Sequence, residues 1–507
     1  MSKFLQLSKS GVIGIAAFIL LSTALPLVDP DYFWHLKTGE YIVAHGALPA
    51  GDVFSFTRLG QPWVLHEWLF EVLVYAIHAA FGDNGVRCMT AAFAVGTLAL
   101  AFTTARRLAG SAIAAWIPLM IGTVAFVGTI SPRPQLLTYL CFALYLSVLL
   151  AFKYAGTVRP LFLLPPLMVV WVNAHAGYAV GVALLLLFAA CEWLLWALRA
   201  RDPAQKRRLL RLTGVVALVL LASLVNPGMF ERWLYPFQVL GMAVNAILQE
   251  WQSPDFHLVR ARAYLALALL FLVSWTYAAR KPDLTELALP LFFAVQGFIA
   301  VRHVPLAVLA LLPFTALALA NGPLAALEAV MRRLAPVQAY LARRGAGGVG
   351  RDLGARESVL NWVMAGAVIL CLPPYMRSLQ AQSGPQARLA ALPRGAADFI
   401  AARGIGGKLF NRYADGGYLL YRLAPHARVV VDGRADVYGD RFITDYMRIY
   451  DGAADWKEKF ERLDIDLAVL PHDAPIRQLL LAHARFREIY RDQRYSVLQR
   501  ATPRAAS

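Results

Sequence analysis

The chain has 507 residues, of which 59% are hydrophobic and only 16% are charged. Soluble globular proteins carry about 25% charged residues, so the composition excludes that class and indicates a polytopic membrane protein. Lysine and arginine number 49 against 32 acidic residues, a net charge of +17. We attribute this excess to basic loops that fix membrane topology rather than to nucleic-acid binding.

The N-terminal residues 1–28 resemble a signal peptide, because Lys3 and Lys9 precede an apolar run. The run is long for a signal peptide, and Ala24-Leu25-Pro26 is a poor cleavage site. We therefore expect an uncleaved first membrane helix over 11–28.

Further apolar segments continue along the chain, and a spanning helix needs about 20 mainly apolar residues. The predicted spans are 86–104, 110–130, 134–152, 159–174, 176–198, 209–225, 262–279, 284–301, 303–320 and 358–375. The shorter segment 67–82 carries Glu67, Glu71 and His78 on one helical face. It either spans facing the bundle or lies at the interface. The fold class predicted is a helical membrane protein of 11–13 spans.

Basic loops set the predicted orientation. Loops 199–212 and 331–356 are rich in arginine and are predicted to be cytoplasmic, as is the N-terminus. Loops 29–66 and 226–261, the Arg302-His303 turn and the residues after 376 are then predicted outside. The orientation counted from the N-terminus agrees with the orientation counted back from the two basic loops only if 67–82 does not fully cross the membrane, or if another predicted span is wrong.

The composition changes from about residue 385. Short strand-like runs at 408–423, 427–439 and 464–470 alternate with helical stretches at 395–403 and 455–463. This predicts a membrane domain over 1–380 and a small extracytoplasmic α/β domain over 385–507. The four cysteines, Cys88, Cys141, Cys191 and Cys371, lie far apart in or beside apolar segments, so we expect no disulfide or cysteine-zinc framework.

The first loop opens with two carboxylates, Asp29 and Asp31, at the predicted membrane boundary. Tyr32, Phe33, Trp34 and His35 follow them, and aromatic residues are common interface anchors. The aspartates are therefore helix caps in an aromatic belt, or carboxylates that serve as a general base or hold a divalent ion.

Other polar residues outside the spans are candidates for binding a substrate. In the first loop they are Asp52, His66 and Glu67; in the loop 226–261 they are Glu250, Asp255 and His257; near the outer face they are Arg133, His175, Arg302 and His303. Arginine is suited to a leaving phosphate, although an arginine near a membrane also extends its side chain to the headgroups.

Two runs in the C-terminal domain are further candidates, with Asn411, Gly416 and Gly417 at an expected turn and Asp432, Arg434 and Asp436 after a Val-Val-Val strand. The two glycines permit close approach of the backbone to another group. The second run binds a saccharide, packs back on the membrane domain or forms an internal salt-bridged turn. The Gly-rich stretch 404–408 lacks the spacing of a phosphate-binding loop, so we expect no nucleotide site there.

Several motifs together carry a resemblance that spans nearly the whole chain. They are DPDYFWHLKTG at 29–39, GALPAGDVFS at 46–55, GQPWVLHEWL at 60–69, NPGMFERWLYPF at 226–237, EWQSPDFH at 250–257, NRYADGGYLLYRLAP at 411–425 and VVVDGRADVYG at 429–439. They resemble a group of bacterial membrane proteins of the glycosyltransferase C superfamily. Phe33 stands where that group has the first of two tryptophans.

The resemblance implies a sugar transferase whose donor is a polyprenyl-phosphate sugar in the inner membrane. Asp31, or Asp29, would be the base for an inverting transfer to an envelope acceptor (a lipid, a glycan or a protein). Branches of the superfamily differ in their need for a divalent ion such as Mg²⁺ or Mn²⁺, and the sequence shows no firm ligand set.

Two other classes of function stay open. A transporter or flippase of lipid-linked saccharides would place polar residues at the bilayer midplane, whereas the predicted spans here are nearly free of charge. A non-catalytic scaffold for envelope assembly would bind a partner through the C-terminal domain, and the loop aspartates would then be dispensable.

Overall fold

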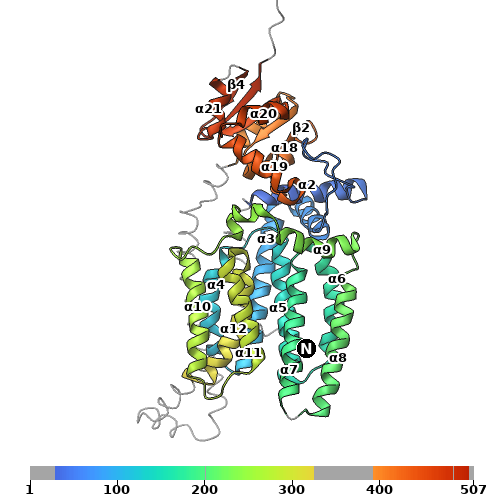
Figure 1. Cartoon of the computed structure of the whole chain (residues 1–507), viewed down its shortest axis with the longest axis vertical. Coiled ribbons are helices and arrows are strands. Elements are labelled where there is room, and N and C mark those ends of the chain that lie inside the picture. The colour runs from blue at the N-terminus through green and yellow to red at the C-terminus, as the bar shows by residue number, and fades with distance from the viewer. Residues whose placement is uncertain (1–28, 200, 325–391, 483–484, 502–507) are drawn as a thin grey trace, which may run out of the picture.

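The computed structural model describes residues 29–199, 201–324, 392–482 and 485–501. A bundle of long helices forms one end of the molecule and an α/β region forms the other (Figure 1). The segments 29–67 and 226–258 lie between these two parts. The predicted spans 11–28 and 358–375, the basic loop 331–356 and the predicted domain boundary at 380–385 fall outside the described residues.

The first loop is half helical. Helix α2 (Pro30–His45) begins where Asp29 caps it and proline occupies the first helical position, and it ends at Gly46. An irregular segment then leads to α3 (Trp68–Ala109), which is broken by Gly82 at φ 62°. The two predicted segments, 67–82 and 86–104, correspond to the two helices that meet at this kink, at a residue whose backbone conformation favours glycine.

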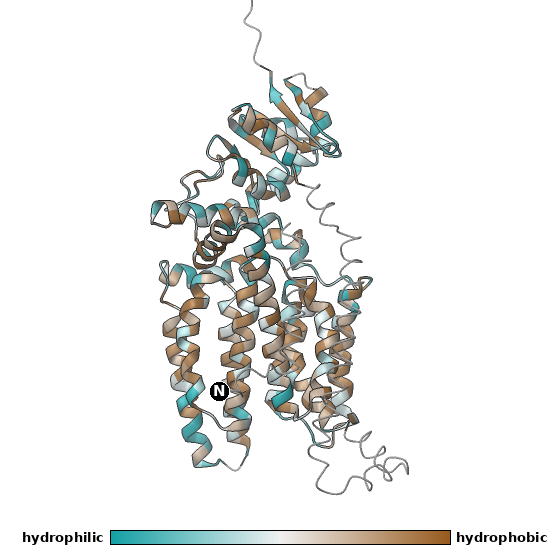
Figure 2. Ribbon diagram, turned by 180° about the vertical axis from the view of Figure 1, so that it is seen from behind, coloured by the Kyte–Doolittle hydropathy of each residue, from teal (hydrophilic) through white to brown (hydrophobic). Residues whose placement is uncertain are grey.

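The bundle is built from apolar helices, which are coloured mainly brown in Figure 2. Besides α3 these are α4 (Ala112–Val127), α5 (Gln135–Ala155), η1 with α6 (Arg159–Leu163 and Leu164–Ala174), α7 (Tyr178–Leu198), α8 (Pro203–Ala222), α10 (Val259–Thr276), α11 (Leu284–Ile299), and η4 with α12 (Val301–His303 and Val304–Ala320). Within the described residues, five helices are long and apolar enough to cross a membrane, and three are apolar but shorter. The chain is a multi-pass membrane protein.

Helix α8 begins earlier than the sequence suggested. The predicted span was 209–225 after a basic loop 199–212, but the helix starts at Pro203 and takes most of the basic residues into its first turns. The Asp202 side chain accepts hydrogen bonds from the backbone N–H groups of Ala204 and Gln205. This N-cap fixes the start, because a capped helix with proline at its first position tolerates long basic side chains that reach towards water.

The segment 226–258 is more ordered than a loop. It contains α9 (Met229–Leu240) and the short turns η2 (Ala243–Ala246) and η3 (Gln249–Trp251). Helix α9 lies across the end of the bundle (Figure 1). Its residues Phe230, Leu234 and Phe237 are each at least half exposed and share one face, which suits a helix lying in the membrane interface.

The C-terminal region is a five-stranded mixed sheet with helices around it. The strands are β1 (Gly407–Asn411), β2 (Ala427–Val429), β3 (Leu467–Pro471), β4 (Phe486–Arg491) and β5 (Tyr495–Arg500), in the order β2-β1-β3-β5-β4. Strands β1, β2 and β3 are parallel, and β5 pairs antiparallel with both β3 and β4. The helices are α17 (Arg394–Ala402), η5 with α18 (Tyr413–Asp415 and Gly416–Leu423), α19 (Ala435–Tyr450), α20 (Trp456–Leu463) and α21 (Pro475–Ala482).

The α/β class and the helices near 395–403 and 455–463 are confirmed. The strand-like run 408–423 is only partly a strand, because Gly416 and Gly417 begin α18 rather than forming a turn. The β4–β5 hairpin was not predicted from the sequence.

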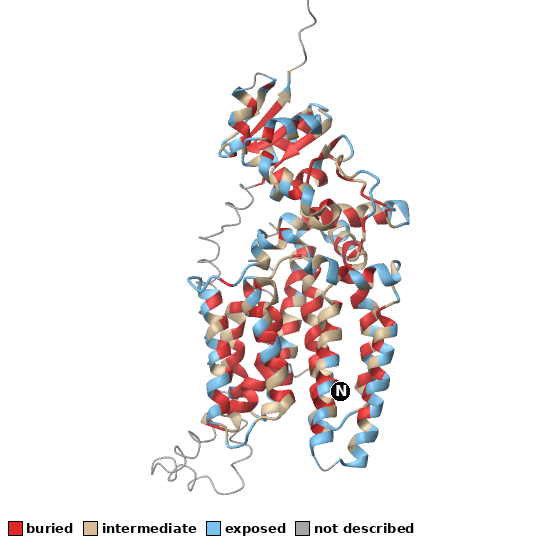
Figure 3. Ribbon diagram, viewed as in Figure 1, coloured by how far each residue is buried: buried red, intermediate tan, exposed pale blue. Residues whose placement is uncertain are grey.

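Two apolar cores hold these parts together, and both are visible as buried segments in Figure 3. The bundle core includes the second half of α3, with Ala94, Ala101 and Phe102. The other core joins α2 and the first half of α3, with Phe70 and Val74, to the C-terminal sheet. The segment 67–82 therefore packs between the bundle and the α/β region rather than within the bundle core. This arrangement favours the alternative in which 67–82 does not cross the membrane.

Candidate functional site

A cavity of about 1180 Å³ lies where the bundle, the first loop, the segment 226–258 and the C-terminal region meet. That volume is slightly above the usual range for small-molecule sites, roughly 300–1,000 Å³. It accommodates a ligand larger than a single small metabolite.

Asp29 and Asp31 stand at the start of α2, on the cavity wall. The Oδ1 atom of Asp29 accepts a hydrogen bond from the backbone N–H of Asp31 at 3.0 Å, so Asp29 is a helix cap, as one of the sequence interpretations proposed. Asp31 lies in the first turn, and its Oδ1 atom accepts a hydrogen bond from Trp34 Nε1 at 3.2 Å. The side chain of Asp31 is therefore the one left to face other groups in the cavity.

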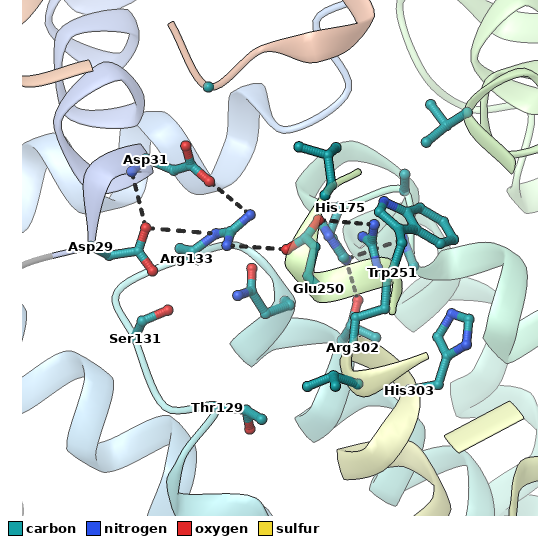
Figure 4. A pocket seen from close by; sticks show the side chains of 18 of the residues that line it. Asp29, Asp31, Thr129, Ser131, Arg133, His175, Glu250, Trp251, Arg302 and His303 are labelled. Carbon is teal, nitrogen blue, oxygen red and sulfur yellow. Dashed lines mark hydrogen bonds and ion pairs between the residues drawn. The ribbon is translucent and has the colours of Figure 1, made fainter. Parts of the chain in front are cut away.

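Arg133 lies between three carboxylates that come from two other segments of the chain (Figure 4). Its guanidinium lies 2.8 Å from Asp31 Oδ2, 3.4 Å from Glu250 Oε2 and 4.0 Å from Asp29 Oδ1. Arg302 continues the chain, 3.1 Å from Glu250 Oε1 and stacked 4.2 Å from the centre of the Trp251 ring. The result is a row of alternating charges, Asp29/Asp31, Arg133, Glu250 and Arg302, which we call the charge row.

The surroundings of Asp31 in the charge row bring the pKa of its carboxyl group close to neutrality. Burial raises the pKa of Asp31 to about 7; Arg133 opposes this shift, and the nearby Asp29 and Glu250 charges reinforce it. For Glu250 burial also opposes ionisation, but Arg133 and Arg302 outweigh it and lower the pKa. A carboxyl group with a pKa near neutrality is suited to general-base catalysis.

A second cluster, of imidazoles and carboxylates, lies beside the charge row. His35 Nδ1 is 3.3 Å from Glu71 Oε1 and 3.6 Å from Glu67 Oε2. His66 Nε2 and His175 Nε2 approach Glu67 Oε1 to 3.2 and 3.6 Å. Burial lowers the pKa of both His35 and His175 to about 3, so these two imidazoles are neutral.

The C-terminal region closes the cavity on the side away from the bundle. Gly433 packs against Asp31 so closely that a Cβ atom at this position would lie 1.9 Å from Asp31 Oδ1. Only glycine allows this approach of the backbone. Arg434 and Asp436 also line the cavity. The loop that follows β2 thus contributes directly to the surroundings of Asp31.

A buried ion cluster ties the first loop to the C-terminal region. The Arg434 guanidinium lies 2.7 Å from Asp52 Oδ1 and 2.6 Å from Asp432 Oδ2, and all three residues are at most 2% exposed. Tyr438 donates a hydrogen bond to Asp432 at 2.7 Å, and the Arg434 guanidinium lies 4.5 Å from the centre of the Trp63 ring. These contacts support the salt-bridge interpretation of the Asp-Gly-Arg run.

The structure gathers most of the candidate residues around one cavity. Those that line it are Asp29, Asp31, Trp34, His35, His66, Glu67, Arg133, Glu250, His257, Arg302, His303, Arg434 and Asp436. Those that do not are Asp52, Asp255, Asn411, Gly416, Gly417 and Asp432.

The six residues away from the cavity have other contacts. Asp255 is exposed and pairs with His257 at 2.8 Å. Asn411 links β1 to the segment after β2 through a hydrogen bond to the Val431 carbonyl. Gly416 and Gly417 lie against the backbone carbonyls of Val431 and Pro30, so the expected close approach is to the chain itself. Asp52 and Asp432 belong to the buried ion cluster.

Sequence reasoning did not single out Trp251 or Glu71 as site residues, and it included Gly433 only as a member of the Asp-Gly-Arg run. Gly433 and Trp251 lie within motifs that were recognised, next to Asp432 and Glu250, so proximity in sequence was the available signal. Glu71 was noted only for sharing a helical face with Glu67.

Comparisons with known proteins bear on the fold. No family model matches the chain, and no curated protein matches it. Among solved structures, ArnT from Cupriavidus metallidurans bound to undecaprenyl phosphate aligns over 98% of both chains, with a TM-score of 0.52 and 16% identity. The chain shares the fold of this structure.

Two further structures support this assignment. The archaeal oligosaccharyltransferase AglB from Archaeoglobus fulgidus, in complex with an inhibitory peptide and dolichol-phosphate, aligns over 90% of this chain and 69% of its own, with a TM-score of 0.55 and 10% identity. Arabinofuranosyltransferase AftD from Mycobacteria aligns over 98% of this chain and 42% of its own, with a TM-score of 0.52 and 14% identity. At these identities the likeness establishes the fold, as the sequence motifs predicted.

Proposed function

We propose that the protein is an integral-membrane glycosyltransferase that moves a sugar from a polyprenyl-phosphate donor to an envelope acceptor. The observation that carries this proposal is the charge row, set in a large cavity between a membrane bundle and a polar α/β region. The solved structures of the same fold are transferases or bind a lipid phosphate, as their descriptions state. Fold alone does not determine activity, so the argument rests on the residues.

Asp31 is the proposed base. It takes the proton of an acceptor hydroxyl as that oxygen forms a bond to the anomeric carbon of the donor sugar. The bond from the anomeric carbon to the phosphate oxygen breaks, and its electron pair leaves with the lipid phosphate. Such a single displacement inverts the anomeric configuration. Asp31 is preferred to Asp29 because the Asp29 side chain caps α2, whereas Asp31 reaches into the cavity.

The leaving phosphate needs positive donors. Arg302 lies at the far end of the charge row, and Arg260 and Arg262 from the first turn of α10 also line the cavity. Because α9 presents apolar side chains outwards beside this wall, the polyprenyl chain has an apolar route from the bilayer to these arginines.

A divalent ion does not fit the charge row. Asp29, Asp31 and Glu250 supply the carboxylate oxygens that Mg²⁺ or Mn²⁺ prefers. However, the Arg133 guanidinium already lies among all three carboxylates, and it supplies the positive charge that an ion would bring. We therefore derive no step through a metal at this place.

The charge distribution favours a site on the outer face of the inner membrane. Arg106 and Arg107 end α3, Lys153 lies in the last turn of α5, and Arg199 follows α7. These basic residues lie at the end of the bundle away from the C-terminal region (Figure 1). Since basic residues favour the cytoplasm, the N-terminus is cytoplasmic and the C-terminal region is extracytoplasmic in this proposal.

The function is tested with purified protein in lipid nanodiscs and a panel of polyprenyl-phosphate sugars. The measurement is release of polyprenyl phosphate, for wild type and for the double variant Asp29→Asn/Asp31→Asn. Asp255→Asn is the matched control, because this aspartate is exposed and lies off the cavity. We expect release by wild type and by the control but not by the double variant. Specific binding without release in any of the proteins would indicate a transporter or scaffold.

A further inference from the structure

The second cluster has the geometry of a metal site. His35 projects from α2, Glu67 caps α3, and Glu71 follows one turn later on the same face of that helix. One ligand atom from each residue lies within 4.8 Å of the others. The exposed fractions are 1% for His35, 8% for Glu67 and 0% for Glu71, so water competes little for these atoms.

The distances suit a shared cation better than direct hydrogen bonds. A tetrahedral zinc site with bonds of about 2.0–2.1 Å separates neighbouring ligand atoms by about 3.3 Å. His35 Nδ1 lies 3.3 Å from Glu71 Oε1 and 3.6 Å from Glu67 Oε2. An ordinary charge-assisted hydrogen bond is shorter, at about 2.7–2.9 Å.

The buried carboxylates also lack compensating charge. Within the described residues, no lysine or arginine nitrogen lies within ion-pair distance of Glu67 or Glu71, and their close partners are imidazoles. The Oε2 atom of Glu71 is buried and has no hydrogen-bond partner there. Buried charges in proteins are normally paired or coordinate a metal, and this oxygen points to a missing cation.

The surrounding imidazoles are oriented for such a site. His66 Nδ1 lies 3.1 Å from the Val64 carbonyl, and its Nε2 lies 3.2 Å from Glu67 Oε1. His66 is not part of the three-residue group whose ligand atoms lie within 4.8 Å of one another. It therefore holds the Glu67 carboxylate from outside that group.

A relay of hydrogen bonds fixes His175. Trp171 Nε1 donates to Thr138 Oγ1 at 2.8 Å, and Thr138 Oγ1 lies 2.7 Å from His175 Nδ1. The backbone N–H of Gly177 also donates to this Nδ1 atom. The ring hydrogen is therefore on Nε2, which faces Glu67 Oε1. An outer partner of this kind holds a ligating carboxylate in place.

We propose that His35, Glu67 and Glu71 bind one Zn²⁺, with His66 and His175 positioning Glu67. Imidazole ligands favour a transition metal over Mg²⁺. The ion clamps α2 to α3 one helical turn from Asp31, next to the charge row but separate from it. Its binding does not depend on the proposed transfer reaction.

The test measures the metal itself. Full-length protein in nanodiscs is stripped with a chelator, equilibrated with Zn²⁺, washed and analysed by mass spectrometry of the elements. We expect one zinc per chain in wild type and in His45→Asn, an exposed histidine at the far end of α2. Glu71→Gln and His35→Asn should lose the zinc, and Thr138→Val should weaken zinc affinity by roughly 10–100-fold through His175.

A second measurement guards against variants that fail to fold. X-ray absorption at the zinc edge of the wild-type protein should show only nitrogen and oxygen ligands at about 2.0–2.1 Å. Substoichiometric zinc in wild type, sulfur ligands, or equal zinc content in wild type and in folded Glu71→Gln would each overturn the proposal.

Discussion

The membrane bundle and the junction differ in what they bury, where the junction is the contact of segments 29–74 and 226–258 with the C-terminal region. The bundle core is mainly apolar, with residues such as Phe142, Leu184 and Leu311, and a buried ion pair joins Lys153 to Glu192. The junction buries Asp52, Glu71, Asp432 and Arg434, each at most 2% exposed, among apolar residues. The bundle therefore depends mainly on apolar packing, whereas the junction depends on several specific charged contacts. The chemistry is concentrated in the junction, where burial can shift pKa values and orient charges.

The largest expected effect comes from removing Arg434, the central residue of the buried ion cluster. Arg434→Met leaves Asp52 and Asp432 buried without their partner, and breaking such a cluster costs about 3–5 kcal/mol. We expect the C-terminal region to lose its attachment to the first loop, seen as a lower melting temperature and as faster proteolysis after residue 392. Arg448→Met removes an exposed arginine paired with Asp455 and should leave both measurements unchanged. Equal effects of the two substitutions would contradict this account.

A substitution at Gly433 tests the position of Asp31, because Gly433 lies against Asp31 and has no side chain in the ion cluster. Gly433→Val places a side chain where Asp31 Oδ1 now lies and must displace the proposed base. A displacement of about 1 Å lowers a rate by about 10²-fold. The measurement is the rate of lipid-phosphate release, with an unchanged melting temperature as evidence of folding. Gly214→Ala, at an open position in α8, is the matched control; a Gly433→Val rate equal to it would refute the placement of Asp31.

Low pH should abolish the proposed transfer activity by protonating Asp31. Burial raises the pKa of Asp31 to about 7, and a base must be unprotonated. The value of kcat/KM should therefore rise with pH and level off above about 7, falling tenfold per pH unit below that point. Arg133→Gln removes a charge that lowers this pKa, so the inflection should move to higher pH. A profile that is flat between pH 5 and 8 would exclude Asp31 as the base.

The smallest expected effect concerns a single hydrogen bond. Tyr438→Phe removes the donor to Asp432 but leaves the Arg434 pairs intact. The expected loss of stability is about 1 kcal/mol, measured as a shift in thermal unfolding. Tyr277→Phe, at an exposed tyrosine at the end of α10, should give no shift. A loss as large as that of Arg434→Met would mean that the tyrosine, not the arginine, carries the cluster.

The same contrast explains what could be predicted from the sequence. Spans such as 134–152 and 176–198 were placed to within a few residues, because apolar length and composition alone determine them. The gathering of Asp31, Arg133, Glu250 and Arg302 was anticipated only as residues near one membrane face. The distances that pair them depend on four separate segments and could not be read from any one of them.

Other features were beyond sequence reasoning for identifiable reasons. The basic start of α8 was assigned to a loop because its charged residues indicated a cytoplasmic loop, and the helix-start signal of Asp202 and Pro203 was overlooked. Asp52 and Arg434 are 382 residues apart, and their pairing requires the C-terminal region to fold back on the first loop. Gly433 had no side-chain chemistry to mark it, and its importance follows only from what it lies against.

The most direct test of the central claim compares Asp31→Asn with Asp29→Asn in single-turnover release of polyprenyl phosphate. These aspartates are two residues apart, but one reaches Arg133 in the cavity and the other caps α2. The account predicts a loss of about 10²–10⁴-fold for Asp31→Asn and a much smaller loss for Asp29→Asn. Wild-type release by Asp31→Asn, or a larger loss in Asp29→Asn, would contradict the assignment of Asp31 as the base.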